Sequence, residues 1–326
     1  MENAHLEVLA REEEARQGKY RSRIFCCTST ACLSAGAGHT LTTLEQAVVA
    51  CHCGEHEAEV VKTGCMGLCS RGPLVRVEAK GEEPVLYGDV SADIAQQIVA
   101  RHVSLCGEDE VIARQGDEET DDAFDFMHLR AALRHAMERR DLEHHQIPLD
   151  LPFFTKQVKV VLSEVGRINP EKLEDYLVQG GYQALARVLS TMTPEQVCDV
   201  IVQSGLRGRG GAGYPTGLKW HFARREDAAQ KYVIVNGDEG DPGAYMDRTV
   251  MEDNPHRVLE GMIIAAYAIG ASYGYLYIRG EYPIAIERVR RAIRAARRRG
   301  ILGKSVLGTE FSFDADVRIG AGAFVC

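Results

Sequence analysis

The sequence predicts an α/β protein with two successive domains, and three observations lead to this expectation. Short apolar runs typical of buried strands alternate with segments of helical periodicity along most of the chain. Seven of the ten cysteines lie between Cys26 and Cys69, which marks a separate N-terminal module. A glycine-rich stretch at residues 205–217 precedes another buried-strand run, and a length of 326 residues allows about two or three domains.

Composition and charge exclude several classes of protein. The formal net charge of −9 argues against a general nucleic-acid binder. No apolar run approaches the roughly 18 residues of a membrane-spanning helix, so direct membrane insertion is not expected. The polar N-terminus, Met1-Glu2-Asn3, does not resemble a signal peptide. We therefore expect a cytoplasmic protein.

The first domain is expected at residues 21–106, after a charged, solvated helix at residues 1–20. Its expected elements are strands at 22–26 and 58–62, a helix at 41–50, a hairpin of strands at 74–77 and 85–87, and a helix at 92–103. Such a small α/β unit presents its loops at the strand ends, and these loops carry the cysteines.

Two cysteine pairs with short internal spacing occupy the loops of this domain: Cys27, Cys32, Cys65 and Cys69. Four thiolates suit either an iron–sulfur cluster or zinc, and the spacing alone leaves zinc open. Gly64 and Gly67 interleave the second pair and would let backbone N–H groups approach inorganic sulfur. We favour a [2Fe–2S] cluster over zinc, and zinc over purely structural thiols. Cys26 is an alternative ligand to Cys27.

The middle of the chain is expected to be an acidic linker and a helix at residues 107–150. Nine acidic residues and one arginine lie between residues 107 and 125, so this part has little to bury. Residues 126–143 then show helical character. The second domain is expected at residues 151–326.

The glycine-rich stretch fits the dinucleotide pattern G-x-G-x-x-G at Gly208, Gly210 and Gly213. That pattern is specific only when a strand precedes it, and here a helix precedes it, beginning with Thr193 as N-cap and Pro194. Bare backbone N–H groups can nevertheless surround a phosphate there. The pattern alone leaves open both nucleotide binding and a plain glycine-rich connection.

Polar residues follow the next predicted strand, at residues 231–235: Asn236, Asp238, Glu239 and Asp241. Ligands of α/β sheets bind at the carboxyl ends of parallel strands. An amide can pair with a planar ring edge, and carboxylates can accept from ribose or ribityl hydroxyls. A simple acidic turn is the alternative, but the neighbouring glycine loop favours a ligand.

Further helices are expected to begin near residues 169, 182 and 193, and at 255–269, with a strand at 273–278. An arginine-rich helix that includes residues 286–299 is expected to present a solvated charged face, and a last strand at 317–319 runs into glycines.

The two cysteine pairs and their spacing resemble the thioredoxin-like [2Fe–2S] ferredoxin domain of NADH dehydrogenase complexes and soluble NAD-linked hydrogenases. The resemblance implies that all four cysteines ligate the cluster.

The second domain resembles the flavoprotein subunit that accepts hydride from NADH in respiratory complex I. It is also similar to diaphorase subunits of bidirectional NAD-linked hydrogenases and formate dehydrogenases. The residues that carry this resemblance are 207–217, then Asn236-x-Asp238-Glu239, then Asp247-Arg248, and 275–282. A ferredoxin module fused ahead of the flavin domain points to the hydrogenase type. The implied fold is a thioredoxin-like domain followed by a Rossmann-like α/β domain that binds FMN and NADH.

The resemblance also implies site residues. The positions that match flavin contacts are Gly208, Gly210, Lys219, Asn236, Asp238 and Glu239. The positions near the nicotinamide or adenine of NADH are Tyr214, Phe222 and Asp241. The remaining loop residues assigned to the cofactor site are Arg209, Gly211, Ala212, Gly213, Pro215, Thr216 and Gly217. Phe324 stands where many relatives have tyrosine, and no side chain is expected to act as a catalytic base.

The implied function is that of an NADH:acceptor oxidoreductase, the NADH dehydrogenase or diaphorase subunit of a larger assembly. Its partners would be other subunits of a hydrogenase, formate dehydrogenase or quinone reductase. Relatives continue past the position of Cys326 with Gly-Glu-Glu and with ligands of a [4Fe–4S] cluster. The second domain is therefore expected to be incomplete. The alternative function is a non-catalytic electron-transfer or assembly module in which only the [2Fe–2S] domain works.

Overall fold

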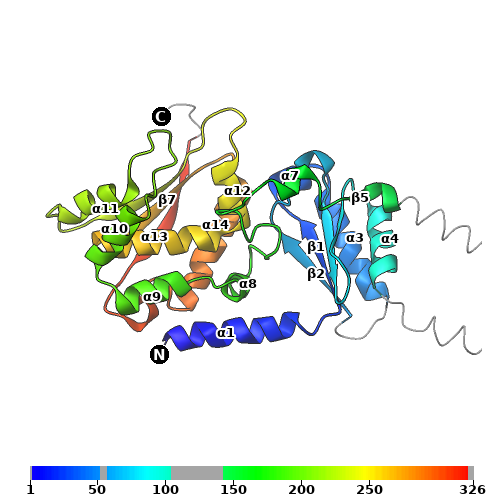
Figure 1. Ribbon diagram of the computed structural model, residues 1–326, viewed down its shortest axis with the longest axis horizontal. Coiled ribbons are helices and arrows are strands. Elements are labelled where there is room, and N and C mark those ends of the chain that lie inside the picture. The colour runs from blue at the N-terminus through cyan, green and yellow to red at the C-terminus, as the bar shows by residue number, and fades with distance from the viewer. Residues whose placement is uncertain (1, 52–56, 104–141, 322–326) are drawn as a thin grey trace, which may run out of the picture. The chain divides into compact units, whose positions relative to one another are not determined.

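The computed structural model describes residues 2–51, 57–103 and 142–321, which form two compact units (Figure 1). We call residues 15–167 the cysteine unit, and residues 1–14 with 168–326 the glycine-loop unit. The sequence places the domain boundary at residue 151, whereas the structure groups residues 151–167 with the cysteine unit because Phe154 packs into its core. The acidic segment at 107–125 and most of the helix expected at 126–143 lie outside the described residues.

The cysteine unit is a five-stranded sheet of order β2-β1-β3-β4-β5, in which only the β1–β2 pair is parallel. Its elements are β1 (Ser22–Cys27), α2 (Thr30–Ser34), α3 (Ala37–Ala50), β2 (Ala58–Thr63), the 3-10 turn η1 (Cys69–Arg71), β3 (Val75–Ala79), β4 (Val85–Tyr87), α4 (Ala92–His102), β5 (Gln146–Ile147) and α7 (Pro152–Thr155). The β-α-β unit followed by a hairpin and a helix confirms the fold expected of this part.

The two faces of this sheet bury different residues, as the two-residue period of a strand requires. Ile24 and Cys26 of β1 pack with Leu44 of α3 and with residues of α4. Phe25 and Cys27 point to the other face and pack beside Cys32. The two adjacent cysteines of β1 therefore lie in different environments.

The glycine-loop unit is built on a parallel three-stranded sheet of order β6-β7-β8. Its elements are α1 (Glu2–Gln17, of which residues 2–14 belong here), α8 (Leu173–Val178), α9 (Gln183–Thr191), α10 (Pro194–Gln203), α11 (Thr216–Arg225), β6 (Tyr232–Gly237), α12 (Met246–Asp253), α13 (Pro255–Ile269), β7 (Tyr273–Arg279), α14 (Pro283–Arg298), the 3-10 turn η2 (Val306–Gly308) and β8 (Asp314–Gly320). Helices cross between successive parallel strands, which confirms the α/β class predicted for this domain.

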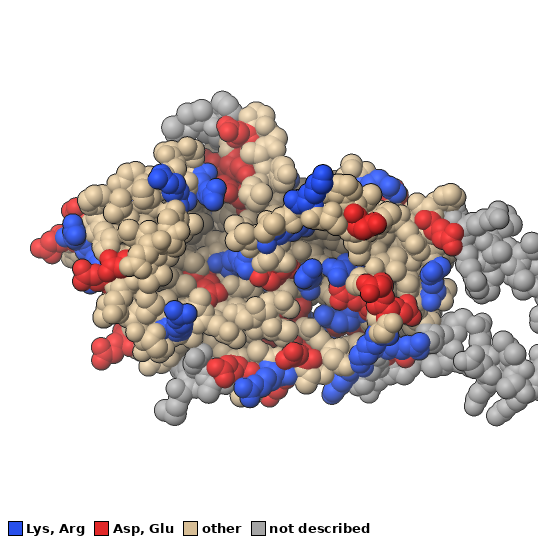
Figure 2. Space-filling model, viewed as in Figure 1, with Lys and Arg blue, Asp and Glu red and all other residues tan. Residues whose placement is uncertain are grey.

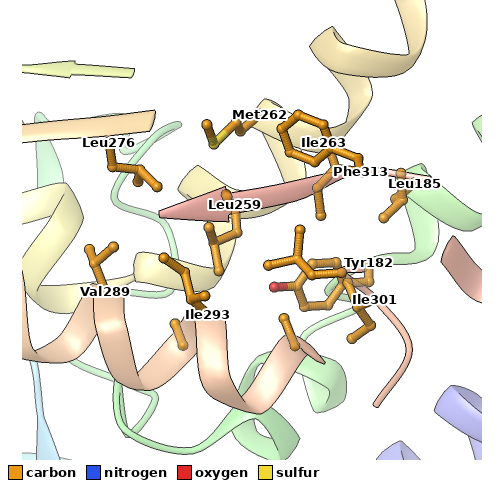
Figure 3. Close-up of a cluster of buried hydrophobic side chains, with 14 of the residues drawn as sticks. Tyr182, Leu185, Leu259, Met262, Ile263, Leu276, Val289, Ile293, Ile301 and Phe313 are labelled. Carbon is orange, nitrogen blue, oxygen red and sulfur yellow. The ribbon is translucent and has the colours of Figure 1, made fainter. Parts of the chain in front are cut away.

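The core of the glycine-loop unit lies where α13 and α14 pack on β7 and β8 (Figure 3). Leu259 and Ile263 of α13, Val289 of α14 and Leu276 of β7 are fully buried. Each such side chain contributes about 1.5–3 kcal/mol through burial. Gly274 lets β7 approach α13, because a Cβ at this position would lie 2.2 Å from Met262 Cε.

A buried polar network ties α8 and α9 to α13. The Glu260 carboxylate accepts hydrogen bonds from Tyr176 Oη at 2.6 Å and from the backbone N–H groups of Tyr182 and Leu185 at 2.9 and 3.0 Å. Tyr182 Oη lies 2.9 Å from His256 Nδ1. Burial lowers the pKa of His256 to about 3, so this imidazole is neutral in the folded chain.

Most charged residues of the N-terminal helix and of the arginine-rich helix are exposed or half-buried, as expected, but each helix also buries a residue that the sequence predicts on a solvated face. The N-terminal helix packs Leu6 into the core of the glycine-loop unit, because α1 carries this apolar residue among its charges. In the arginine-rich helix α14, Arg288 is buried and lies 3.5 Å from Asp253 Oδ1. A buried guanidinium requires such a partner, so this arginine is structural.

The surface of the described residues carries acidic and basic side chains interspersed on the face shown in Figure 2. Among the described helices, none is long and apolar enough to cross a membrane.

Candidate functional site

The four predicted cysteines are brought together at one end of the cysteine unit. Cys27 ends β1, Cys32 lies in α2, Cys65 follows β2, and Cys69 begins η1. Because β1 and β2 are parallel, their carboxyl ends lie at the same edge of the sheet and bring the two loops close. The fold thus positions both cysteine pairs of the motif.

Contacts between the sulfurs show this proximity. Cys65 Sγ lies 3.5 Å from Cys69 Sγ, and the Gly67 N–H donates to Cys65 Sγ at 3.3 Å. A hydrogen bond with Cys27 lowers the pKa of the Cys32 thiol, while burial and the charges of Cys65 and Cys69 oppose this effect. Gly67 has a φ of 100°, which allows its N–H to turn toward the sulfur. These donors suit an anionic thiolate site.

Cys26 faces away from this site. Its side chain is fully buried on the opposite face of the sheet, and burial raises the pKa of its thiol to about 12. Burial on that face separates the Cys26 thiol from Cys27 and Cys32, which pack on the other face. The geometry therefore favours Cys27 over Cys26.

The arrangement of the thiols also bears on the choice between zinc and iron. Within residues 2–51, 57–103 and 142–321, no three His, Cys, Asp or Glu side chains converge on one metal position. A structural zinc site needs four ligands around a single ion. A [2Fe–2S] cluster instead places two ligands on each of two irons. The two pairs, Cys27 with Cys32 and Cys65 with Cys69, supply the four thiolates that a [2Fe–2S] cluster requires, and four thiolates also match the ligand number of zinc.

The glycine loop connects α10 to α11, and its hydrogen bonds to described residues lie at its base. Arg207 and Pro215 form an isolated antiparallel bridge, the Gly208 N–H donates to the Tyr214 carbonyl at 2.8 Å, and Arg207 Nη1 donates to the Gly213 carbonyl at 2.8 Å. The helix before the loop begins with the predicted N-cap Thr193, and Gln196 completes a capping box with it. The loop runs directly into the N-terminus of α11, where backbone N–H groups favour an anion.

The glycines of this loop have two different physical roles. A Cβ at Gly210, Gly211 or Gly213 would meet no atom within 4 Å, so no packing inside the chain requires glycine there. Gly211 and Gly213 have φ values of 97° and 60°, which favour glycine for conformational reasons. Gly210 has no positive φ, so the close approach of a ligand would explain a glycine at this position. By contrast, a Cβ at Gly217 would lie 2.5 Å from the Val202 nitrogen, so Gly217 allows α11 to pack against α10.

The strand-end residues form a turn that is braced by its own hydrogen bonds. Asn236 Oδ1 accepts from the Asp238 N–H at 2.8 Å. The two carboxylate oxygens of Glu239 accept from the N–H groups of Asp247 and Arg248 at 3.0 and 3.1 Å and so cap α12. Burial, with the Glu239 charge as a smaller cause, raises the pKa of Asp247. Glu239 therefore holds this turn in place.

Arg279 and Tyr282, which are not among the predicted site residues, also hold the turn after β6 through hydrogen bonds. Arg279 Nη1 and Tyr282 Oη donate to the Glu239 carbonyl at 2.9 and 3.2 Å, and Arg279 Nη2 donates to Glu281 at 2.7 Å. Arg279 ends β7, the strand next to β6, and Tyr282 follows it. The sequence shows that both residues come at the end of a second parallel strand and so lie at the same sheet edge, but their contacts with Glu239 are revealed only by the fold.

The other predicted cofactor residues are open to solvent. Lys219 and Phe222 are exposed or half exposed on α11, Tyr214 is half exposed in the glycine loop, and Asp241 is exposed after β6. In Figure 1 the glycine loop and the loop after β6 both project toward the end of the unit where β8 ends. Phe324 lies outside the described residues.

Sequence comparisons match about half of this chain to known proteins. Residues 201–326 match the family described as the Nuo51 FMN-binding domain. The HndC component of the NADP-reducing hydrogenase of Solidesulfovibrio fructosivorans is 53% identical over 171 residues, which cover 52% of this chain and 34% of that protein. The F component of the NADH-quinone oxidoreductase of Aquifex aeolicus is 45% identical over 169 residues, which cover 52% and 39%. A solved NAD+-reducing [NiFe]-hydrogenase in the air-oxidized state aligns over 94% of this chain and 44% of that chain, with 22% identity and a TM-score of 0.39.

The chain thus spans about a third to two fifths of the length of these curated relatives. The resemblance to the NADH-oxidising flavoprotein subunits that the sequence predicts is confirmed over residues 201–326.

Proposed function

We propose that this chain is the NADH-oxidising, or diaphorase, part of a multi-subunit redox assembly. The glycine-loop unit would hold FMN and admit NADH, and the cysteine unit would hold a [2Fe–2S] cluster. The observation that carries the proposal is the match of residues 201–326 to an FMN-binding family, on a chain whose other unit gathers four cysteines in two pairs. A flavin and an iron–sulfur cluster on one chain are an arrangement for electron transfer.

The residues of the glycine-loop unit would bind and orient the flavin. The loop at 209–213 exposes backbone N–H groups, and the N-terminus of α11 favours a phosphate. Arg209 and Lys219 add exposed positive charge on either side. The turn at 236–239 offers the Asn236 amide and the Asp238 carboxylate for the polar edge and hydroxyls of the ligand. Bound FMN accepts hydride from a nicotinamide and releases electrons singly.

The residues of the cysteine unit would ligate the cluster through Cys27, Cys32, Cys65 and Cys69. The Gly67 N–H already donates to one of these sulfurs, and hydrogen bonds of this kind tune cluster potentials. Partners would be subunits that receive or supply the electrons, in a hydrogenase or a complex I-like assembly. We place the protein in the cytoplasm, where thiols stay reduced.

Reduction of ferricyanide by NADH tests this function directly. The full chain is reconstituted with FMN, binding is followed by quenching of flavin fluorescence, and turnover is measured with and without the flavin. We expect turnover only with FMN. The Gly210→Val variant should fold normally, because its Cβ meets nothing in the chain, but should lose FMN. Tight FMN binding without turnover would instead support the non-catalytic electron-transfer module.

A further inference from the structure

An open cavity of about 490 Å³ lies in the cysteine unit beside the loop that carries Cys65. The segment at residues 149–167 forms one wall, and β3 and β4 form the other. Phe154 fixes this segment by packing into the core beside Cys27 and Cys32. Gly166 fixes its other end, because a Cβ there would lie 3.3 Å from the Cys65 carbonyl oxygen. The fold of this unit therefore builds the cavity.

The charged residues that line the cavity are all positive: Arg76, Lys159 and Arg167. No Asp or Glu of the described chain lines it. Arg76 pairs with Glu78, which is outside the lining. Neither Lys159 nor Arg167 forms an ion pair with any described residue. In a chain with a net charge of −9, three cations around one cavity with a single carboxylate partner are an unusual concentration of positive charge.

The state of Arg76 shows that this positive charge is only partly compensated. Its Nε atom is buried and has no hydrogen-bond partner in the described structure. Burial lowers the pKa of the Arg76 guanidinium, the Glu78 charge opposes this, and the Arg167 charge lowers it further. A buried N–H without a partner costs free energy, so the chain leaves the guanidinium of this cavity-lining arginine incompletely satisfied.

We propose that this cavity binds a small anion that carries phosphate groups, with Arg76, Lys159 and Arg167 as its ligands. A guanidinium fork matches two phosphate oxygens, and a lysine ammonium adds a point charge. Three cations call for more than one negative charge, which favours a diphosphate or a phosphorylated metabolite over a halide or a monocarboxylate. Gln157 lines the same cavity and can donate its amide N–H groups.

The position of the cavity gives this anion a second effect, which rests on the proposed [2Fe–2S] site. Met66, which lies between Cys65 and Gly67, lines the cavity. Lys159 Nζ lies 4.0 Å from the position of a Cβ at Gly67. A bound phosphate would add negative charge beside the cluster loop, and added negative charge lowers the reduction potential of an iron–sulfur cluster. The anion would thus make the cluster harder to reduce.

Calorimetric titration of the full chain with inorganic pyrophosphate at low ionic strength tests the binding site without any cofactor. We expect binding to the wild-type chain. Lys159→Met should weaken it about tenfold, the loss of one charge-assisted hydrogen bond. Lys156→Met removes an exposed lysine from the same segment, outside the cavity, and should bind like the wild type. No binding to the wild type, or equal weakening by the two variants, would overturn the proposal.

Further measurements distinguish a loss of anion binding from a loss of folding, and test the effect of the anion on the cluster. Thermal melting of each variant reports folding, and Arg167→Met provides an independent substitution at an exposed position that should also weaken binding about tenfold. If it binds pyrophosphate like the wild type, Arg167 is not a ligand and the three-cation site is wrong. With the cluster present, pyrophosphate should shift its midpoint potential to more negative values in the wild type and not in Lys159→Met. Binding without this shift would keep the anion site and overturn its coupling to the cluster.

Discussion

The cysteine site and the glycine loop differ in how far the chain alone completes them. Cys27 and Cys32 are almost fully buried, and their partners Cys65 and Cys69 already touch each other. The tip of the glycine loop is exposed, and its described hydrogen bonds lie at its base. A site made of side-chain ligands is assembled by the packing of strands and helices. A binding loop made of backbone N–H groups needs a bound ligand to accept the hydrogen bonds that the chain itself does not provide.

The largest expected effect is the loss of the cluster from the preassembled site. Cys32→Ser removes one of the four thiolates, so we expect the iron content to fall from about two atoms per chain to almost none. The matched control is Cys26→Ala, which alters the opposite face of the same sheet and should retain iron. Iron and zinc are measured together in the purified chains. Iron retained in Cys32→Ser and lost in Cys26→Ala would reverse the ligand assignment.

The second prediction concerns the pH dependence of the glycine-loop unit's core. His256 has a folded pKa of about 3, well below its unfolded value near 6.5, so below pH 6.5 the unfolded chain binds more protons than the folded chain. As the pH is lowered from roughly 6 to 4, the free energy of unfolding should therefore fall by about 1.4 kcal/mol per pH unit. Urea unfolding at several pH values measures this slope. His256→Gln should flatten it, and an unchanged slope would mean that His256 is not the responsible group.

The third prediction separates a packing glycine from a ligand glycine within one sequence motif. Gly217→Ala forces a Cβ to within 2.5 Å of the Val202 nitrogen, so we expect a loss of about 1–3 kcal/mol in the free energy of unfolding. Gly210→Ala should change that free energy by less than about 0.5 kcal/mol and should weaken FMN binding instead. Denaturant unfolding and flavin titration are measured on both variants. The comparison fails if Gly210→Ala destabilises the chain as much as Gly217→Ala does.

The smallest expected effect concerns the hydrogen bonds that Arg279 donates to the turn after β6. Arg279→Lys keeps the charge but loses the fork that reaches both the Glu239 carbonyl and Glu281. We expect FMN affinity to fall about fivefold, the value of one hydrogen bond, with little change in melting temperature. Lys231→Arg, at the opposite end of β6, is the control and should leave FMN affinity unchanged. Unaltered affinity in Arg279→Lys would remove Arg279 from the positioning residues.

The sequence predicts those parts of the molecule whose pattern is local. The strand expected at 22–26, the N-cap at Thr193 and the cysteine pairs follow from periodicity and spacing over a few residues, and the structure has the strand at Ser22–Cys27 and the cap at Thr193. Arg288 is different, because its burial depends on Asp253 from another helix. The role of Gly217 likewise depends on Val202, and the brace at Glu239 depends on Arg279, 40 residues away. Contacts between distant segments leave no periodic signal, so only the folded chain reveals them.

Reduction of the cluster by NADH tests the central claim most directly. The full chain is loaded with FMN and its iron–sulfur cluster, NADH is added without oxygen, and EPR spectra are recorded. We predict the signal of a reduced iron–sulfur cluster in the wild type and its absence in Gly210→Val, which should keep its cluster but lose the flavin. A cluster that dithionite reduces and NADH does not, in a chain with FMN bound, would contradict electron transfer between the two sites.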